Sequence, residues 1–534
     1  MARRRFPYPV QATAGPFVGV RTVASAPAAD LGFAQTVTNG YPEVGEYGTS
    51  IRLRPPFLLA SIAGALGQVG SRVPQGIYQA PQTDGTVVNL VFCGGKMYRV
   101  TTPTTVVDIT PAAGVTIDSS ARRVWAVPFL GALVVSDGVN RPWLATNLTA
   151  TPCTGTYLTD VASAWDGPPA VYYGKVFGFR DGTLEWSEEA DAHTGYANAT
   201  YDNTWVLAQT STSPIVALAA TDGALYVFRR DSITAIAGAV TKDFTTSGVR
   251  DAVHPTLGTV SAASVVLGTD DLWFRGTDRR VYRLPFGGRP EPVWRVAVDA
   301  HESATAAEVA TEVAGAYHTG LSLVLIGSVS GGLAESVQVF DATTRQYAGT
   351  WTGPEKDAAV TDFGAMGMLW SATERQQVLY YLTSAGHLFY SRPRDNNWQT
   401  AAVDAPVYSG GAYTYTGIAM SVQAPPIAAD PTVQVQWDRV RWIVRTATSG
   451  KTVSAQVGYS THNATGAAQT VTATSVSTLA GSLALECGVL GHGRWIAPSF
   501  SILSGASGAT DRTVVWVEQV AVEGVAVTDR PGLA

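Results

Sequence analysis

The sequence predicts an all-β protein: a β-propeller with an extended N-terminal arm and a C-terminal β-sandwich. Short apolar phrases, each able to pair as a hairpin around a Gly, Asp-Gly or Asn turn, recur along the chain. Their starts lie roughly 35–55 residues apart, which is typical of four-stranded propeller blades. The 54 glycines and 29 prolines are spread along the sequence, as expected for many tight turns.

The composition favours a folded chain with more than one core. Hydrophobic residues make up 46% of the sequence and charged residues only 15%, which argues against disorder. A chain of 534 residues is long enough for two or three domains.

Residues 1–75 are predicted to form the extended N-terminal arm. They are rich in Pro, Gly and Arg and show little strand periodicity. Because such a segment cannot satisfy its own backbone polar groups, we expect it to pack along the propeller or a neighbouring subunit and to help hold a ring together. The candidate residues of this assembly arm are Arg3, Arg4, Arg5, Phe6, Phe17, Arg52, Arg54 and Phe57.

Residues 76–410 are predicted to form the propeller, because they carry the hairpin phrases. A radial array of small sheets protects most strand edges and builds one continuous core. The phrases lie at 87–100, 124–136, 171–179, 214–229 and 264–284, with looser copies at 321–340 and 366–390.

A Pro-rich linker, residues 411–432, is predicted to separate the propeller from the last domain. Residues 433–534 then alternate between apolar and polar side chains, as half-buried antiparallel strands do. Four or more such strands in about 110 residues predict a β-sandwich.

The charge balance argues against a protein that grips nucleic acid. The net charge is −6 and the pI is near 5.7, whereas proteins that hold a phosphate backbone usually carry a basic stripe. A mildly acidic surface would suit a channel past which DNA slides without sequence-specific binding.

Cellular location is predicted from what the sequence lacks. The start of the chain is basic but has no apolar signal-peptide core. The sequence contains no run of 18 consecutive apolar residues, so no membrane span is predicted. The three cysteines, Cys93, Cys153 and Cys487, have no metal-ligand spacing and are expected to be buried thiols. We therefore expect a chain made in a cytoplasm.

Motifs that carry chemistry are mostly missing from the sequence. The triplet Gly94-Gly95-Lys96 lacks the first glycine and the hydroxyl residue of a phosphate-binding loop. No two of the seven histidines have the spacing of a helical metal pair, and no nucleophile elbow occurs. We expect no enzymatic activity, no cofactor and no metal.

One acidic stretch leaves an alternative open. Hydrolysis of a glycan needs two carboxylates several ångströms apart, and a loop with four acids, a Trp and a His could supply them. The other interpretation is that this stretch is a solvated loop between strands and has no binding role. The residues of this candidate glycan loop are Glu185, Trp186, Glu188, Glu189 and Asp191.

Residues 176–191 and 214–238, followed by Asp243-Phe244 and Gly258, form a run of paired strand phrases around an acidic loop. This run resembles the propeller-bearing virion proteins of tailed bacteriophages, a group that includes the tail nozzle (tail tubular protein B) and the packaged-DNA stabilisation proteins. Residues 15–19, 39–40 and 52–57 are similar to the arm that opens those proteins, and the C-terminal alternating strands to their small sandwich.

The resemblance implies a structural virion protein, a tail nozzle or head-to-tail connector subunit, assembled in the host cytoplasm. It implies a homo-oligomeric ring, a hexamer, around the DNA channel, which helps to retain and then pass the genome. The implied partners are portal or adaptor proteins, tail fibres or spikes, and the passing DNA. The alternative is a glycan-binding or glycan-hydrolysing propeller, such as a tail-tip or receptor-binding protein.

Overall fold

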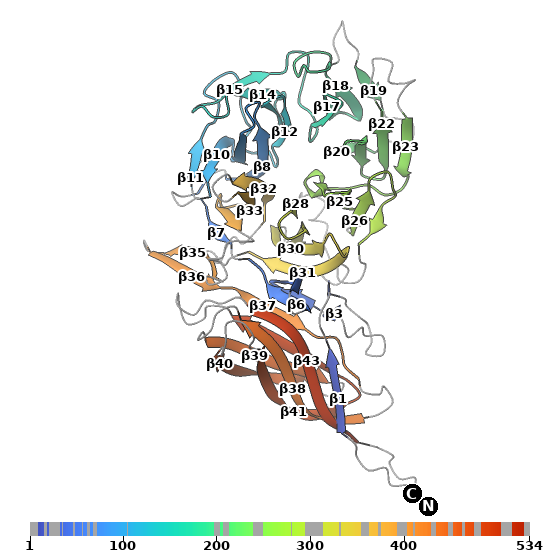
Figure 1. Ribbon diagram of the computed structural model, residues 1–534. Helices are drawn as coiled ribbons and strands as arrows, with labels where there is room; N and C mark the ends of the chain where they lie inside the picture. Colours follow the sequence, from blue (N-terminus) through green and yellow to red (C-terminus); the bar gives the residue numbers. More distant parts are fainter. Residues whose placement is uncertain are drawn as a thin grey trace, which may run out of the picture. The chain divides into compact units, whose positions relative to one another are not determined.

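The computed structural model (Figure 1) contains two compact units. One, which we call the repeat unit, comprises Leu58–Val337 and Ala358–Ser391. The other, the terminal unit, comprises Met1–Phe57, Gln338–Asp357 and Arg392–Ala534. The structure describes residues 9–14, 19–20, 33–34, 36–45, 48–55, 57–60, 65–67, 72–103, 105–196, 203–206, 213–238, 249–278, 280–293, 313–330, 333–353, 363–371, 375–391, 403–409, 412–428, 434–446, 452–461, 465–474, 482–503 and 515–527.

The described residues of the repeat unit form successive antiparallel sheets. Five sheets have four strands paired in chain order. Sheet 1 is β8 (Pro74–Pro81), β9 (Val87–Cys93), β10 (Lys96–Thr102) and β11 (Thr105–Asp108); sheet 2 is β12 (Trp125–Phe129), β13 (Ala132–Ser136), β14 (Trp143–Thr146) and β15 (Thr154–Tyr157); sheet 3 is β16 (Ala170–Tyr172), β17 (Lys175–Arg180), β18 (Thr183–Trp186) and β19 (Thr204–Val206); sheet 4 is β20 (Ile215–Ala220), β21 (Ala224–Arg229), β22 (Ile233–Ala237) and β23 (Val249–His254); sheet 5 is β24 (Val266–Leu267), β25 (Asp271–Arg275), β26 (Val281–Pro285) and β27 (Glu291–Pro292).

Two further groups of strands follow. The sixth is β28 (Gly315–His318), β29 (Leu323–Ser330) and β30 (Leu333–Asp341), and the division between the units falls within β30. Sheet 7 is β32 (Ala365–Ser371), β33 (Gln376–Leu382) and β34 (Leu388–Ser391), completed by β7 (Leu58–Leu59) from far earlier in the chain. The predicted all-β class is confirmed: among the described residues, the helical element is the short η2 (Ala262–Ser264).

The first strands of the sheets contact one another in sequence, in a propeller-like arrangement (Figure 1). Strand β8 contacts β12, β12 contacts β16 and β16 contacts β20. Strand β20 contacts η2, η2 contacts β28, β28 contacts β32, and β32 contacts β8 again. Buried apolar clusters fill the space between sheets 1 and 2, 2 and 3, 3 and 4, 4 and 5, and 7 and 1.

The predicted hairpins form where apolar runs flank a short turn, and the first of these turns uses glycines that accept a left-handed backbone. In sheet 1, β9 and β10 are joined by Gly94-Gly95 with φ of 54° and 76°, a conformation that glycine adopts without steric cost. The phrases at 124–136, 171–179 and 214–229 pair in the same antiparallel way. These hairpin predictions are confirmed.

The terminal unit holds two larger sheets. The first has the order β41 (Ser482–Gly493), β38 (Gln434–Thr446), β43 (Val515–Val527), β6 (Gly48–Leu53) and β5 (Gly40–Gly45), and β1 (Pro9–Ala14) also pairs with β43. The second contains β31 (Gln346–Thr352), β4 (Thr36–Thr38), β37 (Ala419–Gln423), β42 (Ile496–Leu503), β39 (Thr452–Thr461) and β40 (Thr465–Thr474). Two pairs complete the unit: β2 (Gly19–Val20) with β3 (Phe33–Ala34), and β35 (Val403–Ser409) with β36 (Ala412–Gly417).

Strand β38 shows why the C-terminal sequence alternates. Val435 and Trp437 are buried, a register shift follows at Trp437/Arg439, and Val440 and Trp442 are then buried. The bulge moves the buried side chains from odd to even positions. The Trp442 ring lies 5.6 Å from the Phe500 ring of β42, so the two sheets pack face to face.

The arm and the linker differ from what the sequence predicts. Much of the predicted arm is strand: β1, β5 and β6 belong to the same sheet as β38 and β43. The predicted linker contains β36 and β37. Strands β1, β6 and β37 pair with partners distant in sequence, which local periodicity does not reveal, whereas β36 pairs with the neighbouring β35.

Candidate functional site

A pocket of about 270 Å³ lies among the first strands of the sheets of the repeat unit, and we call it the axial pocket. Residues at or just before the starts of β8, β12, β28 and β32 line it, so these strands begin at the same end of the unit. The lining residues are Gln75, Gly76, Ile77, Tyr78, Arg123, Trp125, Pro168, Leu218, Ala219, Ala262, Ala263, Val265, Ala314, Gly315, Ala365 and Met366.

Two buried polar side chains of the pocket hold loops in place. The Gln75 amide donates to the carbonyls of Asp118 (2.6 Å) and Ala121 (3.0 Å) and accepts from the Gly95 N–H at 2.9 Å. Arg123, which is 8% exposed, donates to the carbonyls of Pro74 and Gly364. Gln75 and Arg123 therefore fix the shape of the pocket mouth and place one positive charge there.

The lining combines aromatic surface with buried polar groups. Trp125 is half-buried and Tyr78 donates to the Val124 carbonyl at 2.7 Å, so aromatic surface is held on rigid strands. The described lining residues include no Asp, Glu, His or Cys, the usual acids, bases and nucleophiles of catalysis. Sequence reasoning did not select Gln75 or Arg123; the available signal is that Gln75 is the second residue of β8 and Arg123 lies two residues before β12.

The candidate glycan loop is divided between core and surface. Glu185 and Trp186 lie in β18 and are 2% and 1% exposed. Glu185 accepts the Trp165 indole N–H and lies 3.9 Å from Arg180, while burial raises the pKa of Glu185. Trp186 stacks on Phe177 with ring centroids 6.0 Å apart. Both side chains serve the core between sheets.

The other three acids follow β18. Glu188 accepts from the Asn203 amide at 3.0 Å. Asp191 accepts from the Thr194 hydroxyl at 2.6 Å and from the His193 N–H at 2.7 Å, and these hydrogen bonds lower the pKa of Asp191. Glu189 is exposed. The loop therefore holds its own turn together, and the structure does not bring its acids to the axial pocket.

The described residues of the predicted assembly arm lie inside the terminal unit. Arg52 forms an ion pair with Glu43 and lies over the Trp516 ring, 5.2 Å from its centroid. Arg54, only 1% exposed, donates to Asn39 Oδ1 at 2.9 Å and lies 4.4 Å from the centroid of Phe57. The candidates Arg3, Arg4, Arg5, Phe6 and Phe17 lie outside the residues whose side chains the structure describes.

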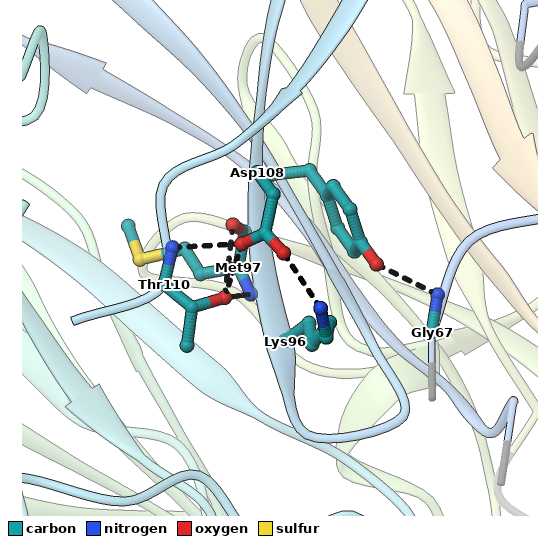
Figure 2. Close-up of polar contacts among 6 residues, drawn as sticks. Gly67, Lys96, Met97, Asp108 and Thr110 are labelled. Carbon is teal, nitrogen blue, oxygen red and sulfur yellow. Dashed lines mark hydrogen bonds and ion pairs between the residues drawn. The ribbon is translucent and has the colours of Figure 1, made fainter. Parts of the chain in front are cut away.

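The glycine-lysine triplet of sheet 1 is part of a structural cluster (Figure 2). Lys96 Nζ lies 2.7 Å from Asp108 Oδ2, and this contact raises the pKa of Lys96. The other oxygen of Asp108 accepts from Thr110, whose hydroxyl accepts from the Met97 N–H. The ammonium group therefore links the start of β10 to the end of β11.

The described residues show neither a metal-binding group nor a reactive thiol. They contain no group of three or more His, Cys, Asp and Glu side chains able to hold a metal ion. The three cysteines are buried and unpaired, and burial raises the pKa of Cys93 to about 12 and that of Cys153 to about 11. Among the described residues, no helix has the length and hydrophobicity to cross a membrane.

Comparison with known proteins gives distant likenesses. No protein-family model and no curated protein matches the chain. The extracellular domain of the hybrid two-component system BT4673 from B. thetaiotaomicron is 9% identical with a TM-score of 0.42, over 71% of this chain and 46% of that one. The chain thus spans less than half the length of that structure.

Two other solved structures show the range of these likenesses. The Neurospora crassa Pan2 WD40 domain is 9% identical with a TM-score of 0.37, over 64% of this chain and 97% of that one. An exo-β-1,3-galactanase from Phanerochaete chrysosporium is 10% identical with a TM-score of 0.27, over 88% of this chain and 100% of that one. With TM-scores under 0.5, these likenesses carry no argument about function.

Proposed function

We propose that this chain is a non-catalytic binding and assembly protein whose repeat unit is a closed seven-bladed β-propeller. The axial pocket carries the proposal, because the inner strands surround a preformed cavity whose described lining has binding groups and lacks catalytic ones. The contact from β32 back to β8 and the pairing of β7 with β34 support closure. Closure would leave few strand edges free.

The ligand that best fits the axial pocket is a single sugar ring at the end of a glycan. A cavity of about 270 Å³ lies just below the range of drug-sized pockets. The aromatic face of Trp125 can stack on the C–H face of a sugar, while the Arg123 guanidinium places a positive charge in the lining. With Glu185 and Trp186 in the core, we propose binding without hydrolysis.

The assembly role we propose is that of a structural virion protein of a tailed bacteriophage. The sequence resemblance at 176–191 and 214–238 supports this role. A cavity of about 270 Å³ cannot pass a DNA duplex, so a DNA channel would have to lie between subunits of a ring, with six subunits in our proposal. A glycan site on such a subunit would suit a receptor-binding position on the tail.

Glycan arrays and native mass spectrometry of the full-length protein test both roles. We expect wild-type protein to bind defined glycans without cleaving them, Trp125→Ala to lose the binding, and Glu185→Gln with Glu188→Gln to keep it. We expect rings of six subunits in native spectra. Cleavage that disappears in the glutamine variants would make the loop an active site. Absence of any glycan binding would refute the glycan role, and a monomer at all concentrations would refute the ring.

A further inference from the structure

Four hairpin turns of the repeat unit share one backbone conformation. Each is a two-residue connection between paired antiparallel strands with positive φ at both positions, as in a type I′ turn. Such turns favour Asn, Asp or Gly at the first position, because other side chains strain the left-handed backbone. The turns, with their φ values, are Gly94-Gly95 (54° and 76°), Leu130-Gly131 (47° and 79°), Tyr173-Gly174 (48° and 69°) and Asp181-Gly182 (49° and 76°).

Two of these turns carry large apolar residues at the strained position. Leu130 is 66% exposed and Tyr173 is 51% exposed. The other two turns use Gly94 and Asp181, which suit the conformation. The left-handed backbone disfavours Leu130 and Tyr173, and exposure to water disfavours their apolar side chains. Residues that are both strained and exposed in this way suggest a binding role.

Leu130 and Tyr173 lie at corresponding places in consecutive sheets. Each sits between the first and second strands, β12 and β13 in sheet 2, and β16 and β17 in sheet 3. The starts of the inner strands meet at the axial pocket, so these turns are at the other end of their strands. We call Leu130, Tyr173 and the residues beside them the hairpin face.

The loop that carries exposed Asp84 lies beside the first turn. Gly131 packs closely against Thr83, because a Cβ atom placed on this glycine would lie 2.8 Å from the Thr83 side chain. Thr83 is followed in sequence by Asp84, which is exposed. The Asp84 carboxylate accepts two hydrogen bonds from Thr86, which lower its pKa.

The second turn has a similar acidic neighbour. A Cβ added at Gly174 would lie 3.4 Å from Glu189, and the Ala190 N–H donates to the Gly174 carbonyl at 2.9 Å. Lys175, beside this turn, is half-buried, whereas Glu189 is exposed. The more accessible charge around the two apolar side chains is therefore negative.

We propose that the hairpin face is a docking surface for a protein segment that presents apolar side chains flanked by Lys or Arg. Burial of Leu130 and Tyr173 would remove apolar surface from water, and Asp84 and Glu189 would pair with the basic residues. This surface is distinct from the axial pocket, so its partner could bind while a ligand occupies the pocket.

The test uses the full-length protein and a short synthetic peptide of alternating Leu and Lys, with a Leu/Glu peptide as the charge control. Fluorescence anisotropy at low salt should show binding of the Leu/Lys peptide and at least about tenfold weaker binding to the Leu130→Asn/Tyr173→Asn variant. Asn suits the turn, so the melting temperature of that variant should rise. Val139, 57% exposed in the loop between the second and third strands of sheet 2, provides the control Val139→Asn, which should bind as wild type.

Several outcomes would overturn the docking surface. They are no binding of the Leu/Lys peptide, equal binding of the Leu/Glu peptide, unchanged binding by the double variant, or equal loss in Val139→Asn. A lower melting temperature of the double variant would make the two residues structural. If the double variant instead lost binding to glycans, the hairpin face would be a carbohydrate site and the proposed protein partner would be wrong. Loss of glycan binding in Trp125→Ala alone leaves this surface unaffected, so the two proposals can fail separately.

Discussion

The two units are built from the chain in opposite ways. In the repeat unit, almost every strand pairs with its neighbour in sequence, and the pairing of β7 with β34 is the distant exception among the described strands. In the terminal unit, β43 pairs with β1 and β6, so residues near both ends of the chain share one sheet. Pairing between strands far apart in sequence therefore involves one short strand in the repeat unit and several strands in the terminal unit.

This difference teaches where each unit depends on remote sequence. Local hairpins close short loops and can form early, whereas pairing across the whole chain closes a very long loop. We therefore expect the repeat unit to tolerate loss of the N-terminal segment and the terminal unit to fail without it.

The largest expected effect is that of deleting residues 2–50. The deletion removes β1 to β5 and the first half of β6, and also Asn39, which accepts from buried Arg54. We expect amides of β38 and β43 to lose their protection from hydrogen exchange, while amides of β21 and β25 stay protected. If the amides of β38 and β43 remained protected, the N-terminal strands would be dispensable and the contrast between the units would fail.

A smaller effect is expected at the one distant pairing of the repeat unit. The Ala60 N–H donates to the Leu388 carbonyl at 2.8 Å beside β7. Ala60→Pro removes this donor, leaves the Leu388 carbonyl without it, and should lower the free energy of unfolding of the repeat unit by about 2 kcal/mol. Ala60→Gly keeps the donor and is the control, with an expected loss of about 1 kcal/mol. Equal losses in urea unfolding would mean that β7 does not hold sheet 7 in place.

The last effect is absent at neutral pH and concerns acid sensitivity within the repeat unit. His318 of β28 is fully buried, neither ring nitrogen has a hydrogen-bond partner in the described structure, and burial lowers its pKa from 6.5 to about 4. The unfolded chain binds a proton below pH 6.5 and the folded chain only near pH 4. This group therefore leaves stability unchanged above pH 6.5 and lowers it as the pH falls to 4, by up to about 3 kcal/mol.

His318→Leu tests this assignment, because leucine occupies similar space and takes up no proton. Urea unfolding at pH 7 and at pH 4.5 should show a smaller loss on acidification for the variant than for wild type. An identical loss in both proteins would place the acid sensitivity elsewhere in the chain.

The sequence was informative where a single hairpin contains the whole signal. Val87–Cys93 and Lys96–Thr102 are apolar runs around two glycines, and they pair as the pattern predicts. The sequence was less informative at Glu185, because the acidic residues around it indicate a solvated loop. Trp165, twenty residues away, donates to Glu185 and helps to bury it, and no local pattern indicates that contact.

The amino-acid sequence by itself determined the all-β class, the hairpins and the alternating C-terminal strands, because hydrophobic periodicity and turn residues act over a few residues. Only the tertiary structure decided that Arg54 is buried against Phe57 and Asn39, that β7 completes sheet 7, and that Gln75 and Arg123 meet at one pocket. These features depend on residues brought together from distant parts of the chain, and their energy comes from burial and hydrogen bonds that exist only after the sheets have packed.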